Sequence, residues 1–198
     1  MRFIGITGGV GAGKSEILAY LKKRKDIRVL LADEIAHDLM LPGNECYERI
    51  CTRFPDESLR DEKGMFQKEQ LAKVIFQDTA NRAAMNEIVH PAVKEYVKKV
   101  FGEEQRKGQL KYLFLEAALL IEEQYDKICD ELWYIYTSEE NRRIRLKESR
   151  GYSDAKIDAI FASQLTEEEF KKACKVVIDN NGSREELYKQ IEEGLKNG

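Results

Sequence analysis

Apolar residues gather in five short runs along the chain, and each run is bounded by charged or glycine-containing segments. The runs span residues 1–7, 27–32, 111–115, 131–136 and 175–178. Continuous apolar runs of this length are typical of strands that are buried on both faces of a sheet. We therefore predict five buried strands at these positions.

Between the runs, apolar residues recur at helical spacing. Residues 14–25 place Ile17 and Leu21 on one face, and the C-terminal segment repeats the pattern with Leu187 and Leu195. Strands that alternate with helices favour a parallel sheet that is covered on both sides. The pattern predicts an α/β fold, with a parallel five-stranded sheet flanked by helices.

The segment from residue 34 to 100 looks mostly helical and is too long for one crossover helix. Its breaks are Pro42-Gly43, Phe54-Pro55-Asp56 and the stretch from Asp61 to Gly64. We expect His90-Pro91 to end a helix, because the residue before a proline avoids the α region. The segment is interpreted as an inserted helical subdomain beside the carboxyl edge of the sheet, where α/β proteins bind ligands.

Composition narrows the class of protein. The length of 198 residues, with 42% hydrophobic residues, suits one α/β domain, and a net charge of −3 argues against a general nucleic-acid binder. No apolar run approaches the roughly 20 residues of a membrane span, and no basic-then-apolar leader precedes the first strand, so a cytoplasmic protein is expected. Four cysteines without a C-x-x-C pair and only two histidines disfavour a multi-histidine or zinc site.

Residues 8–15 read GGVGAGKS and fit the pattern G-x-x-x-x-G-K-S. Glycines let the backbone curl so that successive N–H groups point at phosphate oxygens, and the helix that follows adds its positive N-terminal end. Because the motif follows a predicted strand and opens a predicted helix, we interpret it as a phosphate-binding loop (P-loop). The residues expected to bind ATP are Gly9, Gly11, Ala12, Gly13, Lys14, Ser15 and Glu16. Lys14 would reach the β- and γ-phosphates, and the Ser15 hydroxyl would ligate Mg²⁺. The Glu16 carboxylate would turn outward and leave the Glu16 backbone N–H to bind a phosphate.

The P-loop alone does not separate kinases from nucleotide switches. The chain has no guanine-reading N-K-x-D segment and is too short for a motor, which leaves the small kinases. A non-catalytic nucleotide-binding switch or interaction module is the alternative from another class.

Two carboxylates follow predicted strands and are candidates for the chemistry. Asp33 comes just after the second strand, and phosphoryl transfer needs a group that orients the attacking hydroxyl and takes its proton. The alternative for Asp33 is an N-cap of the next helix. Glu116 ends the third strand and is a candidate for holding Mg²⁺ or its water shell, with a plain surface glutamate as the alternative.

A basic group follows the fourth strand and consists of Arg142, Arg143, Arg145, Lys147 and Arg150. Arg142 and Arg145 share one helical face by their i, i+3 spacing, and a solvated helix with Glu–Arg pairs is the alternative. Asn180 and Asn181 form a turn after the fifth strand, and a plain Asx turn is the alternative to a nucleotide contact there.

Seven segments together resemble the dephospho-CoA kinase family over nearly the whole chain. They are TGGVGAGKS (7–15), ADEIAH (32–37), LPG (41–43), GMFQKEQLAKVIF (64–76), MNEIVHPAV (85–93), EAALLIEE (116–123) and VIDNNG (177–182). After the first segment, their order and spacing carry the resemblance rather than any one of them. Gln164 also matches a glutamine of the family that has no assigned role.

The resemblance implies that the chain transfers the ATP γ-phosphate to the ribose 3′-hydroxyl of dephospho-CoA, with Mg²⁺ as cofactor. It implies one kinase domain over residues 1–198, with a core (1–33, 101–137 and 166–198), a helical substrate subdomain (about 34–100) and a mobile helical lid (about 138–165). Another small-molecule kinase with the same core is the alternative, because the acceptor would be determined by residues 34–100.

The resemblance also assigns residues. It implies Asp33 as catalytic base, Lys14 and Arg145 as catalytic residues, Asn180 and Asn181 at the adenine, and Lys68 and His90 as substrate-binding residues, with packing or helix capping as the alternative for His90. His37 lies one helical turn after Asp33, so we expect it to orient that carboxylate or bind substrate, with a solvent-facing role as the equal alternative. The chain departs from the family's pattern at Leu31, where a second acid is common, at Glu16, where threonine is common, and at Ser149, where the next lid arginine would fall. We expect small-molecule partners only, no nucleic acid or membrane, and a monomer or weak homo-oligomer.

Overall fold

A computed structural model describes residues 1–196, so the last two residues of the predicted core segment 166–198 lie outside the described part. The chain divides into two compact units. One contains residues 1–30 together with the chain from residue 104 onward, and the other contains residues 31–103.

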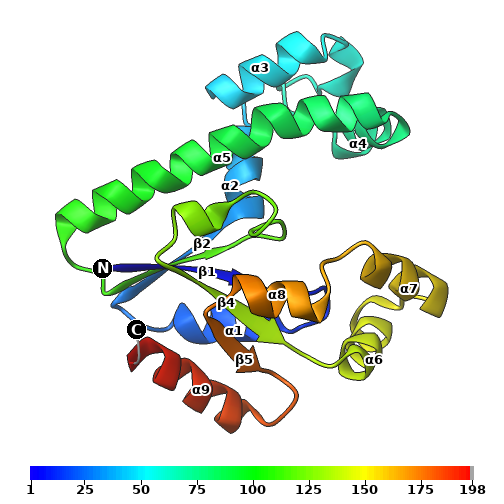
Figure 1. Ribbon diagram of the computed structural model, residues 1–198. Helices are drawn as coiled ribbons and strands as arrows, with labels where there is room; N and C mark the ends of the chain where they lie inside the picture. The colour runs from blue at the N-terminus through cyan, green and yellow to red at the C-terminus, as the bar shows by residue number, and fades with distance from the viewer. Residues whose placement is uncertain (197–198) are drawn as a thin grey trace. The chain divides into compact units, whose positions relative to one another are not determined.

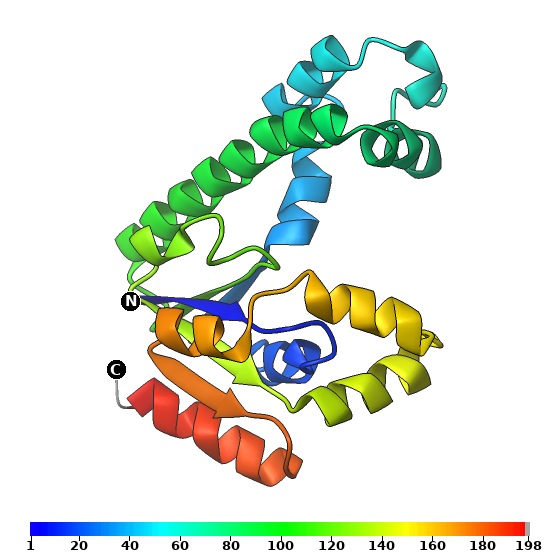
Figure 2. The ribbon, with the colours of Figure 1, turned by 45° about the vertical axis from the view of Figure 1, so that its right-hand side comes forward.

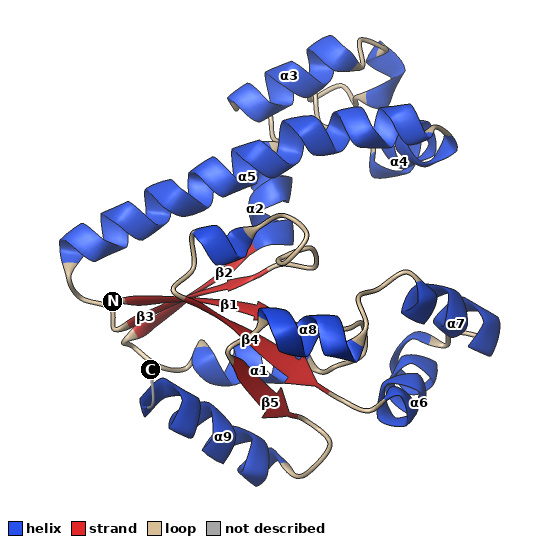
Figure 3. Ribbon diagram, in the orientation of Figure 1, coloured by secondary structure: helices blue, strands red, loops and turns tan. Residues whose placement is uncertain are grey.

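The first unit is built on a five-stranded sheet with the strand order β2-β3-β1-β4-β5 (Figure 3). The strands are β1 (Arg2–Thr7), β2 (Ile27–Leu31), β3 (Tyr112–Glu116), β4 (Glu131–Tyr136) and β5 (Val176–Asp179). β1 pairs in parallel with β3 and β4, and β4 pairs in parallel with β5. The predicted parallel five-stranded sheet is confirmed, and each predicted strand lies within one residue of the observed one.

Helices cover both faces of this sheet. Those of the first unit are α1 (Lys14–Leu21), α6 (Glu139–Arg150), α7 (Asp154–Ala162), α8 (Glu167–Ala173) and α9 (Arg184–Lys196), with a short 3₁₀ helix η2 (Tyr125–Lys127). Trp133 and Tyr134 are neighbours in β4 and therefore point to opposite faces. Phe170 of α8 stacks on Tyr134 with ring centroids 4.8 Å apart, while Gly194 of α9 lies against the Trp133 ring. Figure 1 shows α1 beside α9 on one side of the sheet and α8 on the other.

Because the strands are parallel, their carboxyl ends meet at one edge of the sheet. β1 leads directly into the glycine loop, β3 ends at Glu116, β4 leads to Thr137, and β5 leads to Asn180. This edge therefore collects residues that are more than 100 positions apart in the sequence, as the sequence pattern predicted.

The two helices that follow β4 are each capped by a serine. Ser138 accepts a hydrogen bond from the Asn141 N–H at the start of α6, and Ser153 accepts one from the Lys156 N–H at the start of α7. Gly151 ends α6 with a positive φ of 61°, a conformation that favours glycine. Figure 2 shows α6 and α7 as a pair next to the loop that follows β1.

The second unit is helical. It contains α2 (Ala32–Leu39), α3 (Glu45–Arg53), the 3₁₀ helix η1 (Glu57–Leu59), α4 (Lys68–Gln77) and most of α5 (Thr79–Lys107). Its core includes Tyr47, Ile50 and Leu71, and the Tyr47 hydroxyl donates to the Gly64 carbonyl at 2.6 Å. None of the helices in the described chain combines the length and the apolar composition that a membrane crossing requires.

The prediction that His90-Pro91 ends a helix is wrong. Pro91 lies inside α5, which continues for 16 residues beyond it to Lys107. The exposed ring of Pro91 faces away from the buried stripe of Val89, Val93 and Val97. Burial of that stripe outweighs the hydrogen bond that Pro91 cannot donate to the Glu87 carbonyl.

Candidate active site

The P-loop runs from the end of β1 at Thr7 to the start of α1 at Lys14. Gly11 and Gly13 have φ angles of 84° and 81°, in the left-handed region that side chains other than glycine rarely adopt. A Cβ on Gly13 would also overlap the Asn180 amide nitrogen. The glycines of the motif are therefore required by the backbone and by the close approach of β5's loop.

Lys14 and Glu116 come together at the carboxyl edge. The Lys14 ammonium donates to the Gly8 carbonyl at 2.7 Å and lies 3.6 Å from the Glu116 carboxylate. Ser15 is the second residue of α1, and its side chain is exposed. The structure thus brings together the lysine and the carboxylate that the sequence assigned to phosphate and metal binding, and Ser15 follows Lys14 directly in α1.

Glu16 does turn its carboxylate away from the P-loop. The carboxylate accepts hydrogen bonds from the Tyr188 hydroxyl and the Arg184 guanidinium of α9. The hydrogen bond to Glu16 raises the pKa of the Tyr188 hydroxyl above its ordinary value. The Glu16 N–H, which we expected to be offered to a phosphate, donates to the Gly13 carbonyl at 3.1 Å.

Side chains of the turn after β5 form hydrogen bonds to the P-loop and to the start of α6. The buried Asn180 amide donates to the Ala12 carbonyl at 2.7 Å, and the Thr137 hydroxyl donates to the same carbonyl at 3.0 Å. The Asn181 side-chain oxygen accepts from the Ser138 N–H and the Asn141 amide, both at 2.9 Å. These amides hold the P-loop and the start of α6, so the turn is more than a plain Asx turn.

Two arginines of α6 reach the P-loop. Arg145 donates to the Asn180 carbonyl at 2.8 Å and to the Ala12 carbonyl and Thr137 hydroxyl at 3.4 Å. Arg142 donates to the Val10 carbonyl at 2.9 Å. The shared face predicted from their i, i+3 spacing is confirmed.

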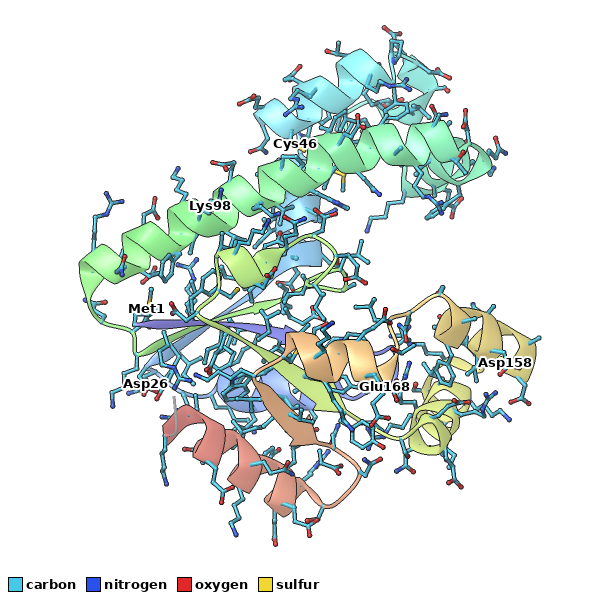
Figure 4. All side chains as sticks on the ribbon, viewed as in Figure 1. Met1, Asp26, Cys46, Lys98, Asp158 and Glu168 are labelled. Carbon is cyan, nitrogen blue, oxygen red and sulfur yellow. The ribbon has the colours of Figure 1, made fainter. Side chains whose placement is uncertain are left out.

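The other basic residues of α6 behave as a solvated face. Arg143 pairs with Glu139, Asp154 and the outward-lying Asp158 that is labelled in Figure 4. These carboxylates, with Asp158 first, raise the pKa of the Arg143 guanidinium. Lys147 pairs with Asp154 at 2.8 Å, and the Arg150 guanidinium lies 5.9 Å from the centre of the Tyr152 ring.

The remaining predicted residues lie in the helical unit. Asp33 is the second residue of α2 and His37 lies one turn later, both exposed and on one face of the helix. The N-cap of α2 is Leu31, so the alternative interpretation of Asp33 as an N-cap is excluded. Lys68 begins α4 with an exposed side chain, and His90 is half-buried in α5.

This unit also contains a cavity of about 460 Å³ between the end of α2, α3 and α5. Its lining includes Leu39, Cys46, Arg49 and Tyr96. Among the described residues, none of the three predicted substrate-binding side chains lines it.

Comparison with known proteins identifies the family. The family model described as dephospho-CoA kinase matches residues 2–186. The chain belongs to the dephospho-CoA kinase family. It is 33% identical over 192 residues to the dephospho-CoA kinase of Shouchella clausii, covering 97% of this chain and 96% of that protein.

Solved structures show the same fold as this dephospho-CoA kinase family chain. A Thermus thermophilus protein of known crystal structure superposes with a TM-score of 0.76 and 28% identity, covering 98% of this chain and 96% of that one. The dephospho-CoA kinase from Campylobacter jejuni superposes with a TM-score of 0.73 and 21% identity, covering 99% of this chain and 98% of that one.

The donor set of this dephospho-CoA kinase family member fits Mg²⁺. Residues 1–196 contain no group of three or more His, Cys, Asp or Glu residues placed to hold a metal ion. Mg²⁺ is commonly bound through one or two carboxylates, substrate phosphates and water rather than by a dedicated cage of protein ligands. The Glu116 carboxylate, 3.6 Å from the Lys14 ammonium, and the exposed hydroxyl of the next residue, Ser15, match that requirement.

Sequence reasoning left two side chains of this site without a role. The sequence placed Arg142 in the basic group, on the helical face that it shares with Arg145, and matched Gln164 to a family glutamine with no assigned role. In the structure, the Gln164 side-chain oxygen accepts from both the Val10 N–H and the Arg142 guanidinium. The i, i+3 spacing was the available signal for Arg142, whereas no local pattern marks Gln164.

Proposed function

We infer that the chain phosphorylates the ribose 3′-hydroxyl of dephospho-CoA with ATP and so produces coenzyme A. The observation that carries this inference is the family match over residues 2–186, which includes the whole P-loop. Relatives that bear the name dephospho-CoA kinase align with this chain over almost their full length.

The donor half of the proposed reaction uses the sheet edge of the first unit. The P-loop N–H groups and the positive end of α1 bind the phosphates of ATP, and Lys14 exchanges its contact with Gly8 for phosphate oxygens. Ser15 and Glu116 hold Mg²⁺, which supplies charge neutralisation at the phosphates when it is bound. Arg145 acts as the lid arginine that stabilises charge on the transferring group, supported by its position on the Ala12 carbonyl.

The acceptor half uses residues of the helical unit. The Asp33 carboxylate accepts the proton of the 3′-hydroxyl as its oxygen forms the new bond to the γ-phosphorus, while the bond from that phosphorus to ADP breaks. His37, one turn along the same helix, orients Asp33 or the ribose. Lys68 and His90 bind the substrate, with Lys68 as the cation for its phosphate groups.

The proposal also covers the localisation, the partners and the oligomeric state of the enzyme. Both substrates are soluble small molecules, and we propose a cytoplasmic enzyme that is a monomer or a weak homo-oligomer, without a nucleic-acid partner. Mass measurement by light scattering over a range of protein concentrations would test the oligomeric state.

A coupled ADP-release assay tests the function directly. Wild-type protein is supplied with ATP, Mg²⁺ and one of four acceptors, namely dephospho-CoA, adenosine, shikimate or gluconate. We expect ADP release with dephospho-CoA, and a product whose ³¹P spectrum contains a 3′-phosphomonoester. ADP release with another acceptor but not with dephospho-CoA would show that dephospho-CoA is not the acceptor substrate. No ADP release with any acceptor would favour a nucleotide-binding switch.

A further inference from the structure

Both backbone polar groups of Val10, at the tip of the P-loop, are bound by side chains from the α6–α7 region. The Val10 carbonyl accepts from Arg142 Nε at 2.9 Å, and the Val10 N–H donates to Gln164 Oε1 at 3.3 Å. The same Gln164 oxygen accepts from the Arg142 guanidinium, which closes the contact into a ring of three residues. Gln164 lies just beyond α7, so the ring joins both ends of the helical pair to one residue of the P-loop.

Arg142 is held tightly against the P-loop. Its guanidinium lies 4.2 Å from the centre of the Phe161 ring, and a Cβ on Gly9 would overlap it. Burial lowers the pKa of the Arg142 guanidinium from its ordinary value. The side chain is therefore fixed from three directions, by Val10, Phe161 and Gln164.

Arg142 lacks a carboxylate partner in the part of the chain that the structure describes. Glu139, the one carboxylate whose charge favours its protonated form, forms an ion pair with Arg143 at 3.0 Å instead. The neighbouring Arg143 forms ion pairs with three carboxylates. The charge of Arg143 is therefore balanced by acidic side chains, whereas the charge of Arg142 is not. At Arg142 the chain uses an uncharged amide, Gln164, in the place where a carboxylate would form an ion pair.

A partly buried cation without an anionic partner is costly unless a ligand supplies the counter-charge. The amide oxygen of Gln164 fixes the geometry of Arg142 but leaves its positive charge uncancelled. That charge lies on the P-loop, where an anionic oxygen of a nucleotide is the expected ligand. We propose that Arg142 is a nucleotide-phosphate-binding residue and that Gln164 is the positioning residue that holds it on Val10.

This proposal rests on the nucleotide-binding half of the proposed function and needs no assumption about the acceptor. The substitution Gln164→Glu separates positioning from structural support. A glutamate keeps an oxygen that accepts from both Val10 and Arg142, so the fold should be as stable as before, but its charge neutralises Arg142. The matched control is Ala162→Glu, which adds the same charge at an exposed position two residues away.

The dissociation constant of ADP, measured by titration calorimetry without dephospho-CoA, is the readout. We expect Gln164→Glu to raise this dissociation constant about 10-fold, because the introduced carboxylate neutralises the Arg142 charge and weakens its hydrogen bond to a phosphate. Ala162→Glu should stay within about 2-fold. The thermal unfolding midpoint of ligand-free Gln164→Glu should equal or exceed that of the wild type. An ADP affinity unchanged in Gln164→Glu, or lowered equally in Ala162→Glu, would overturn the proposal.

A second variant, Arg142→Met, tests the proposal if Gln164→Glu does not fold. Methionine keeps an apolar stem against Phe161 and removes the uncompensated charge, so the ligand-free protein should not unfold at a lower temperature. We expect the stabilisation by saturating ADP to be smaller than in the wild type, as weaker binding requires. A lower unfolding midpoint with unchanged ADP affinity would show a purely structural arginine and would overturn the proposal. Failure of the wild type to phosphorylate dephospho-CoA would change the proposed function but not these binding results.

Discussion

Lys14 and Arg145 carry charges that the protein compensates to different degrees. The Lys14 ammonium has the Glu116 carboxylate 3.6 Å away. Arg145 forms no ion pair within residues 1–196 and donates instead to the Asn180 and Ala12 carbonyls. Carbonyl oxygens orient a guanidinium without cancelling its charge, so Arg145 keeps its attraction for an anion.

The substitution Arg145→Ala tests the importance of that attraction. We expect kcat with dephospho-CoA to fall by about 10³-fold, since an arginine on the transferring phosphoryl group contributes on that scale. Arg143→Ala is the matched control on the same helix, and its exposed ion pairs predict a change of no more than a few-fold. A loss of only a few-fold in Arg145→Ala would remove this residue from the lid chemistry.

Asp33 is tested by the isosteric change Asp33→Asn. An amide cannot accept the proton of the attacking hydroxyl, so we expect kcat to fall by about 10²–10⁴-fold while ADP binding and thermal stability stay unchanged. Asp38→Asn, an exposed carboxylate five residues later on the same helix, should retain wild-type turnover. A wild-type kcat in Asp33→Asn would show that another group takes the proton.

The site could be predicted from the sequence where its residues are consecutive. The P-loop is recognisable because the glycines that its backbone requires and the Lys14 and Ser15 side chains that phosphate and metal binding require stand together in one short segment. Gln164 could not be given a role in this way, because its partner Val10 lies 154 positions away and the contact exists only once α7 has folded back. The spacing of Arg142 and Arg145 identified their common face but not the carbonyls that each would reach.

At the scale of elements, α5 shows how burial overrides a local rule. Proline disfavours a helix interior, yet the 29 residues of α5 pass through Pro91. The rule failed because it considers one residue, whereas the helix is stabilised by a buried stripe on both sides of the proline. The strands, by contrast, were predicted within one residue because buried apolar runs such as that of β4 end abruptly at polar residues.

Replacing Pro91 should therefore raise the stability of the protein. Pro91→Ala restores an N–H that can donate to the Glu87 carbonyl, and we expect the free energy of unfolding to rise by about 1–2 kcal/mol in urea titrations. Pro55→Ala, in an exposed loop, is the control of opposite sign and should lose up to about 1 kcal/mol, because the unfolded chain gains freedom. Reduced stability in Pro91→Ala would mean that the restriction which the proline places on the unfolded chain, or the contacts of its ring, outweighs the missing hydrogen bond.

At the scale of the whole molecule, one buried carboxylate joins three strands of the sheet. Glu131 begins β4 and accepts hydrogen bonds from Arg2 of β1 and from the Trp133 indole N–H at 2.8 Å, and Lys175, which precedes β5, lies 3.2 Å away. Burial opposes ionisation of Glu131. The hydrogen bonds from Trp133 and Lys175 and the charge of Arg2 outweigh burial and lower its pKa below the ordinary value.

This lowered pKa predicts a pH-dependent contribution to global stability. The unfolded chain takes up the Glu131 proton at a higher pH than the native protein does, so the contribution is fully present above the unfolded pKa. It is lost as the pH falls through the lower native value. We expect Glu131→Gln to reduce the free energy of unfolding by about 1–3 kcal/mol at pH 7, and the difference from wild type to shrink as urea titrations move to pH 3. Glu62→Gln, at an exposed position, is the control and should show no such trend. If the difference in free energy of unfolding between Glu131→Gln and wild type stays constant or widens in acid, packing rather than the charge of this carboxylate stabilises the sheet.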